Sequence, residues 1–131
     1  MAATKDRWKH IPFTVGVAIP FRAIFSREEF DRIREGMMPE AMEDKWFGYF
    51  EEPHLFLHRS WGGQPVYRVA LIAHGDGVAV AEALCVAEVL AKSTPEYEAK
   101  LLDFLISNLI LGYDTPFPRS PPSRRRWWRW R

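Results

Sequence analysis

Hydrophobic and polar positions divide the chain into a short helix, a run of strands and a second helix. Residues 1–12 are polar and predict a flexible N-terminus, and the apolar run 13–25 predicts a strand followed by an extended segment. Ser26 and Glu29 have the spacing of a capping box, so a short helix is expected directly after Ser26. Gly36 and Pro39 are expected to end this helix.

Four short segments rich in β-forming residues come next. They cover residues 46–51, 55–61, 66–73 and 78–86, and they are separated by Glu52-Pro53, Gly62-Gly63 and Gly75-Asp76-Gly77. Loops this short join antiparallel neighbours, so the pattern predicts a four-stranded meander. The three alanines of the last segment also leave a partly helical structure open.

The last predicted element is a long, heavily buried helix. Thr94 is the expected N-cap, Pro95 the first helical residue and Gly112 the residue that closes the helix. Apolar residues cover a wide face of this segment, namely Tyr97, Leu101, Leu102, Leu105, Ile106, Leu109 and Ile110. The predicted fold is α+β in a single domain over residues 13–113. It is an antiparallel meander of four to five strands with the long C-terminal helix packed on one face and a short N-terminal helix.

Counting outward from two-residue loops predicts the strand register. Trp46 is expected opposite Arg59, Phe47 opposite His58, and His58 opposite Tyr67. One face, expected to pack against the C-terminal helix, then carries Phe47, Tyr49, Phe56, His58, Tyr67, Val69 and Leu71. The other face carries Trp46, Phe50, Leu55, Leu57, Arg59, Trp61, Val66 and Arg68.

Two indoles and two guanidinium groups gather on this second face. They belong to Trp46, Arg59, Trp61 and Arg68, and Lys45 lies beside them in the sequence. Arginine stacked on tryptophan is a stable structural arrangement by itself. It is also the arrangement by which proteins hold a base and its phosphate. Beside the purely structural interpretation, the pattern therefore predicts a platform for an anionic, base-containing ligand.

Charge is divided unequally between the body and the end of the chain. Residues 1–115 hold 12 of the 18 basic residues and all 17 acidic residues, a net charge of about −5 before histidine. Residues 114–131 are rich in proline and predict a disordered Pro/Arg/Trp-rich tail. The tail ends in Arg124, Arg125, Arg126, Trp127, Trp128, Arg129, Trp130 and Arg131. This composition leaves three interpretations open, namely a tail without a role, a tail that binds a nucleic acid or other polyanion, and a tail that binds an anionic membrane surface. Of the two binding interpretations, the polyanion is slightly favoured.

No specific motif predicts an enzyme. The single cysteine, Cys85, lies in an apolar run and is interpreted as a buried hydrophobic residue. The four histidines lack the spacing of metal ligands, so neither a metal nor a cofactor is expected. His58 is a weak catalytic candidate, because a hydrogen-bonded core histidine is the favoured interpretation. No signal peptide or bilayer-length apolar stretch is present in the sequence, so a cytoplasmic location is expected.

One stretch resembles a known pattern. Residues 42–51 (MEDKWFGYFE), 55–63 (LFLHRSWGG), 66–69 (VYRV) and 101–109 (LLDFLISNL) are similar to a family of small bacterial and phage proteins that has no settled function. The resemblance spans roughly residues 20–112 and excludes the tail. Some members accompany nucleotide- or ADP-ribose-handling domains, so the resemblance implies a nucleotide-related ligand. Gly48 replaces the bulky aliphatic residue of the pattern, which predicts a gap beside Trp46 and Phe50.

Three functional hypotheses follow. The first is a small binding module for a nucleotide or nucleic acid that uses the Arg/Trp platform. The second is a protein-interaction module of immunity or antitoxin type, in which the acidic body binds a basic protein. The third is an enzyme acting on a nucleotide or an ADP-ribosyl bond, with His58 as acid/base and Arg59 on the phosphate. The third requires His58 to be exposed. The oligomeric state has no signature in the sequence.

Overall fold

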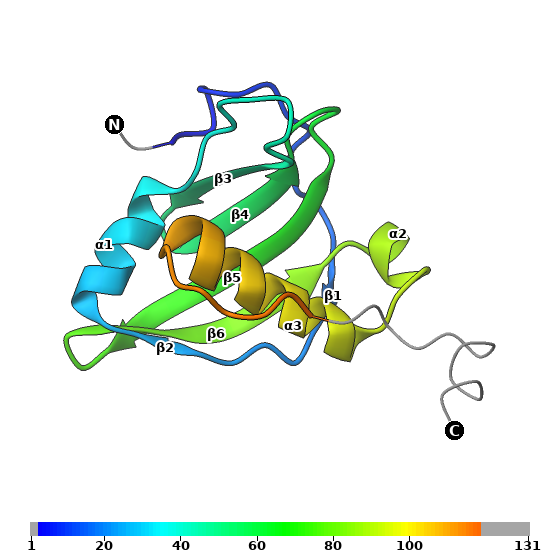
Figure 1. Cartoon of the computed structure of the whole chain (residues 1–131). Helices are drawn as coiled ribbons and strands as arrows, with labels where there is room; N and C mark the ends of the chain where they lie inside the picture. Colours follow the sequence, from blue (N-terminus) through cyan, green and yellow to red (C-terminus); the bar gives the residue numbers. More distant parts are fainter. Residues whose placement is uncertain (1–2, 119–131) are drawn as a thin grey trace.

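An antiparallel sheet forms the centre of the molecule, of which a computed structural model describes residues 3–118 (Figure 1). Strands β3 (Trp46–Glu51), β4 (His54–Arg59), β5 (Pro65–His74) and β6 (Gly77–Cys85) pair in chain order. Two short strands, β1 (Val17–Ala18) and β2 (Ile24–Phe25), both pair with β6. The predicted α+β fold with an antiparallel meander is confirmed. In the described residues the sheet has six strands, since the segment 13–25 contributes two.

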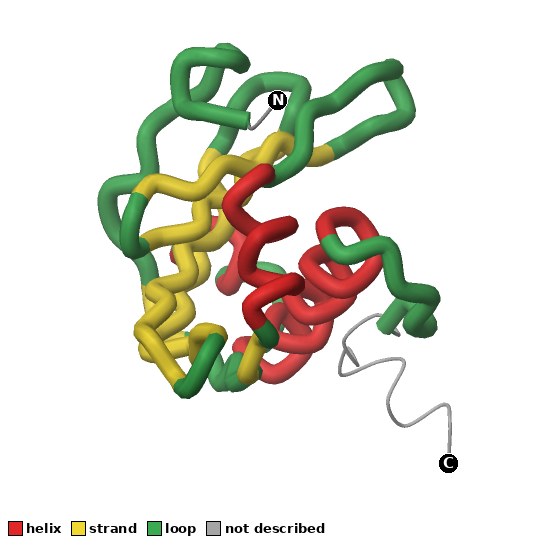
Figure 2. Tube along the Cα trace, turned by 90° about the vertical axis from the view of Figure 1, so that its left-hand side faces the viewer, coloured by secondary structure: helices red, strands yellow, loops and turns green. Residues whose placement is uncertain are grey.

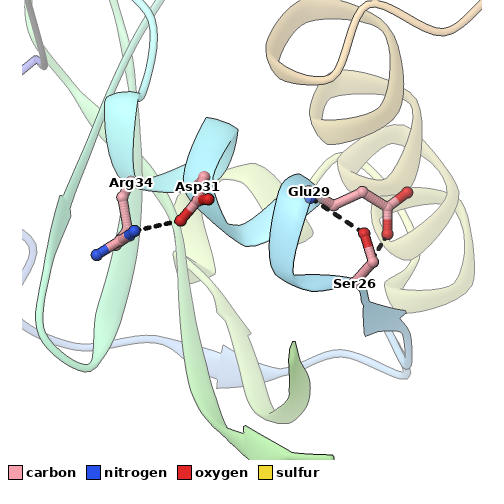
Figure 3. A network of polar contacts seen from close by, with 4 residues as sticks. All are labelled: Ser26, Glu29, Asp31 and Arg34. Atoms are coloured by element: carbon pink, nitrogen blue, oxygen red, sulfur yellow. Dashed lines mark hydrogen bonds and ion pairs between the residues drawn. The ribbon is translucent and has the colours of Figure 1, made fainter. Parts of the chain in front are cut away.

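Helix α1 (Arg27–Glu35) begins and ends at the residues expected from its local signals. The amide of Glu29 donates to Ser26 Oγ at 3.1 Å, and the amide of Ser26 donates to the Glu29 carboxylate at 2.8 Å (Figure 3). Figure 3 also shows the ion pair between Arg34 and Asp31. Gly36 adopts a φ of 68° and terminates the helix. This helix is therefore set by sequence signals within one turn of its ends.

The C-terminal helical segment differs from the long regular helix that was predicted. Helix α3 (Pro95–Phe104) does begin at its predicted cap, where Thr94 Oγ1 accepts from the amide of Tyr97 at 3.1 Å. From Leu105 to Ile110 the chain continues as η1 (Leu105–Ile110), a π-helix. The wider turn of a π-helix accommodates both Ile106 and Leu111 in the core, where each is 1% exposed. A short helix that was not expected, α2 (Ala87–Leu90), connects β6 to α3.

Both faces of the sheet are covered, by different parts of the chain. The longer helices lie beside one face, where α3 and η1 pack with α1 over the main hydrophobic core (Figure 2). Residues 3–13 contact the opposite face, although a flexible N-terminus was expected there. The amide of Ala3 donates to the carbonyl of Glu35 at 2.7 Å, and the amide of Ile11 donates to that of Gly63 at 2.8 Å. Ala3 is itself buried.

The first hairpin has the predicted register, and the second is shifted by one residue. Trp46 lies opposite Arg59 across β3 and β4, as expected. Across β4 and β5, however, Leu57 lies opposite Tyr67, the residue that was expected to face His58. The connection between these strands is not a two-residue loop but spans residues 60–64, and the register shifts again beside Leu57 in a β-bulge. The prediction failed because it assumed the shortest loop.

A one-residue shift moves every side chain of β5 to the other face of the sheet. The helix-covered face therefore carries Trp46, Phe50, Leu55, Leu57, Tyr67, Val69 and Leu71. The face toward the N-terminal segment carries Phe47, Tyr49, Phe56, His58 and Arg68. The predicted helix-packing face is thus divided between the two sides.

The gap predicted beside Gly48 is absent from the structure. A Cβ atom at this position would lie 2.7 Å from Leu57 Cδ2 and 3.4 Å from Met37 Cγ. The amide of Met37 donates to the carbonyl of Gly48 at 3.0 Å, and the amide of Gly48 donates back at the same distance. The missing side chain therefore lets the segment after α1 lie directly on β3.

Candidate ligand-binding cleft

Two of the predicted platform residues form a stacked pair. The register of β3 and β4 sets Trp46 beside Arg59, and the guanidinium carbon lies 4.9 Å from the centroid of the indole ring. The indole also stacks on Tyr67, with 6.0 Å between ring centroids and 23° between planes. Trp46 is half-buried and Arg59 is exposed. The pair thus presents a guanidinium cation stacked on an indole ring that the sheet holds in place.

The stacked pair borders a cleft with a volume of about 1060 Å³. Its walls come from the segment 11–15, the near ends of β3, β4 and β5, and the helices α2 and α3. Arg59 and Lys92 line the cleft and are exposed, whereas Tyr67 and Glu98 line it and are buried. The exposed part of the cleft therefore carries two cations and one carboxylate, that of Glu88, and the inner end contains a second carboxylate. The volume of the cleft is just above the upper end of the range of roughly 300–1,000 Å³ that is usual for small-molecule sites, so a drug-sized ligand would fit.

Glu98 is the central polar group of the inner end. The hydroxyl of Tyr67 donates to Glu98 Oε1 at 2.5 Å, and that of Ser93 donates to Oε2 at 2.6 Å. The N-cap Thr94 and the following Pro95 begin α3 just before Glu98, so its carboxylate lies in the first helical turn. That position favours negative charge, because the N-terminal end of a helix carries partial positive charge. The side chain is 3% exposed.

Burial and the charge of Glu98 shift the protonation of its neighbours. Burial and then the hydrogen bond to Glu98 raise the pKa of Tyr67 well above its usual range. Burial, followed by the same carboxylate, raises the pKa of Cys85 to about 12. The pKa of Tyr97 is raised by burial and by Glu98 in the same order. These groups stay protonated near neutral pH, so Tyr67 remains a donor to Glu98.

Lys45 lies at a second, smaller cavity that shares its wall with the cleft. This cavity has a volume of about 480 Å³, and both Trp46 and Arg59 line it as well. It extends along α3 and η1 toward Phe117, whose ring contacts that of Phe104 at 4.8 Å between centroids. Lys45, Trp46 and Arg59 are therefore neighbours, as the sequence predicted.

Trp61 and Arg68 do not join this group. Trp61 lies beyond the end of β4, where its indole packs edge-on against Trp8 at 5.7 Å between centroids. Arg68 lies on the opposite face, with its guanidinium carbon 5.4 Å from the ring of Phe13 and its Nη2 3.7 Å from Glu82. Neither residue lines the cleft or the second cavity. The predicted four-residue platform is therefore reduced to one stacked pair, because Trp61 lies in the connection 60–64 and the register of β5 places Arg68 on the opposite face.

His58 is buried on the face covered by the N-terminal segment. Its Nε2 lies 2.9 Å from the carbonyl oxygen of Ile11, and its ring contacts that of His10 at 4.7 Å between centroids. Burial, and next the proximity of His10, lower the pKa of His58 to about 4. Nδ1 has no hydrogen-bond partner among the described residues. The open environment that the enzyme hypothesis requires is not found around His58, since the side chain is 0% exposed.

Glu98 was not predicted as a site residue from the sequence. The signal was its position three and four residues before Leu101 and Leu102, on the apolar face of α3. A carboxylate on such a face has to find donors inside the protein, which here are two hydroxyl groups. Their residues, Tyr67 and Ser93, come from a strand and a loop that only the fold brings together.

Comparisons with known proteins found no match for this chain. No family model matches this chain, no curated protein matches it and no solved structure matches it. The resemblance drawn from residues 20–112 therefore stays a prediction.

Within residues 3–118, no group of three or more His, Cys, Asp or Glu side chains is placed to hold a metal ion. No helix in that same stretch is long and apolar enough to cross a bilayer. The Arg/Trp run at residues 124–131 lies outside the described residues.

Proposed function

We propose that this chain is a binding module whose cleft takes an anionic ligand that contains an aromatic base, such as a nucleotide. The observation that carries the proposal is the exposed Arg59 guanidinium stacked on Trp46 at the edge of a 1060 Å³ cleft. None of the ion pairs formed among residues 3–118 includes Arg59. Its charge is therefore available to a ligand.

The cleft offers separate environments for the two parts of such a ligand. Arg59 and Lys92 are exposed cations at its outer part and suit a phosphate. Apolar lining residues such as Val66, Val89 and Leu101 suit the flat faces of a base. Guanidinium and indole both stack on bases, so the Arg59–Trp46 pair suits the junction of the two parts.

Calorimetric titration with a panel of mononucleotides tests this proposal. The wild-type chain is expected to bind at least one mononucleotide, and Arg59→Ala is expected to weaken that binding by about tenfold or more, because one charge-assisted contact is lost. Arg68→Ala is the matched control. It also removes an arginine that lies over an aromatic ring, but on the opposite face of the sheet. It should leave the affinity unchanged.

Two results would reject the proposal. One is the absence of binding to every mononucleotide at millimolar concentration. The other is an equal loss of affinity in Arg59→Ala and Arg68→Ala, because that would indicate a general charge effect rather than a site.

The immunity or antitoxin-type module is the alternative, and the charge of the body favours it. Residues 1–115 carry a net charge of about −5, and Glu40, Glu43 and Asp44 line the second cavity beside Lys45. A basic protein partner would bind with strong salt dependence and without regard to nucleotides. The same titration therefore separates the two functions.

The run 124–131 is proposed as an accessory contact to polyanions or to anionic membranes.

A further inference from the structure

The polar cluster at the inner end of the cleft consists of Tyr67, Ser93 and Glu98, and its side chains offer a ligand only hydrogen-bond acceptors. Tyr67 and Ser93 each have one hydroxyl proton, and both protons are used in bonds to Glu98. The two hydroxyl oxygens then have lone pairs left, and so does the carboxylate, which has about four acceptor sites in all. A ligand group that reaches this cluster is therefore favoured if it donates hydrogen bonds.

The negative charge of Glu98 also favours a ligand group that donates hydrogen bonds. Glu98 is nearly fully buried in the wall of the cleft, and no ion pair within residues 3–118 includes it. Buried carboxylates are normally compensated by a cation or by several donors. The first turn of α3 and two hydroxyl groups supply part of this compensation. Donors from a ligand would supply more.

We infer that the Glu98 carboxylate accepts hydrogen bonds from the base of the ligand and thereby selects guanine. This inference rests on the proposed function, because it names the base that the cleft takes. Guanine presents two adjacent N–H donors, the ring N1–H and the exocyclic amine, which match the two oxygens of a carboxylate. Adenine and cytosine place a ring acceptor beside their amine, and uracil flanks its single N–H with two carbonyls. Each of these three would direct a lone pair at the carboxylate.

The arrangement of charges in the cleft agrees with this orientation. Glu98 and Tyr67 are buried, whereas Arg59 and Lys92 are exposed. A guanine nucleotide would thus enter with its base edge toward Glu98 and leave its phosphate at the exposed cations. The opposite orientation would bring a phosphate against a buried carboxylate, which is repulsive.

Titration of the full chain with GMP, IMP and AMP tests the inference. IMP keeps the N1–H donor of GMP but lacks the amine, and AMP lacks both features of the guanine edge. Wild-type protein is expected to bind GMP at least about tenfold more tightly than AMP, with IMP between them, since each charge-assisted bond corresponds to about a factor of ten. This series needs no variant, so it stays informative if a substitution prevents folding.

Two variants identify the residue responsible. Glu98→Gln keeps the size of the side chain and can still accept from Tyr67, but it should reduce the ratio of GMP to AMP affinity to near one. Arg59→Ala should weaken GMP and AMP by the same factor and leave that ratio unchanged. Thermal unfolding of both variants verifies that they are folded.

The possible failures are distinguishable. If AMP binds as tightly as GMP to the wild-type chain, or if Glu98→Gln retains the preference, the assignment of Glu98 is wrong while the proposed nucleotide site stands. If no mononucleotide binds, the proposed function is wrong, and the base assignment fails with it.

Discussion

Protonation of His58 should destabilise the protein in mild acid. Its pKa is about 4 in the folded protein, where burial and the neighbouring His10 oppose a positive charge, against an ordinary value of 6.5. Between these two values the unfolded chain binds more protons than the folded one, so stability falls as pH falls from about 6.5 to about 4. One pKa unit corresponds to about 1.4 kcal/mol, so the difference amounts to roughly 3 kcal/mol.

The structure also indicates where the loss originates. His58 Nε2 donates to the carbonyl of Ile11, so the neutral ring carries its proton on Nε2 and Nδ1 is bare. A second proton on Nδ1 would find no acceptor among the described residues. Protonation therefore places an unpaired charge between the sheet and the N-terminal segment, close to His10.

Urea unfolding followed by tryptophan fluorescence between pH 7.5 and pH 4.5 measures this effect. His58→Gln is the informative variant, because its amide nitrogen can still donate to Ile11 but does not titrate. From pH 7.5 to pH 4.5 the free energy of unfolding should fall in both proteins, but the fall in His58→Gln should be smaller than that in the wild type by roughly 2 to 3 kcal/mol. His74→Gln removes an exposed histidine at the β5–β6 turn and serves as the control. Identical pH dependence in wild type and His58→Gln would refute the reasoning.

Three further outcomes are expected. Tyr67→Phe should cost about 1–3 kcal/mol in urea unfolding, because it removes one of the two donors to the buried Glu98, whereas Tyr97→Phe should cost little. Gly48→Ala should destabilise by about 1–3 kcal/mol in the same assay, since the added Cβ would lie 2.7 Å from a side-chain carbon of β4. Deletion of residues 124–131 removes five arginines. It should weaken binding to single-stranded DNA and flatten the dependence of log K on log salt by roughly 3.5 units. An unchanged slope would show that the run makes no phosphate contacts.

Local signals in the sequence predicted the elements better than their assembly. The capping box at Ser26 and the cap at Thr94 were found because each depends on residues within a single turn. The β3–β4 register was found because Glu52-Pro53 does separate strands that end and begin beside it. The β4–β5 register was missed because Gly62-Gly63 lies inside a longer connection, and loop length has no local signature there.

The same difference explains how much of the cleft was predictable. Trp46 and Arg59 were placed together correctly, since their contact depends only on the first hairpin. Arg68 was placed on the wrong face because its position depends on the second hairpin. Glu98 was missed because its partners come from β5 and from the loop before α3. Contacts between elements that are distant in the chain cannot be counted from a turn.

The cover that residues 3–13 provide has a practical consequence for anyone shortening this protein. The aromatic rings of Phe47, Tyr49 and Phe56 lie beneath that segment. A version starting at Phe13 would therefore expose a hydrophobic sheet surface to water. Such a version should self-associate or be insoluble on expression, even though it retains every strand and helix. A cut chosen from the element boundaries alone would therefore fall inside the folding unit rather than at its border.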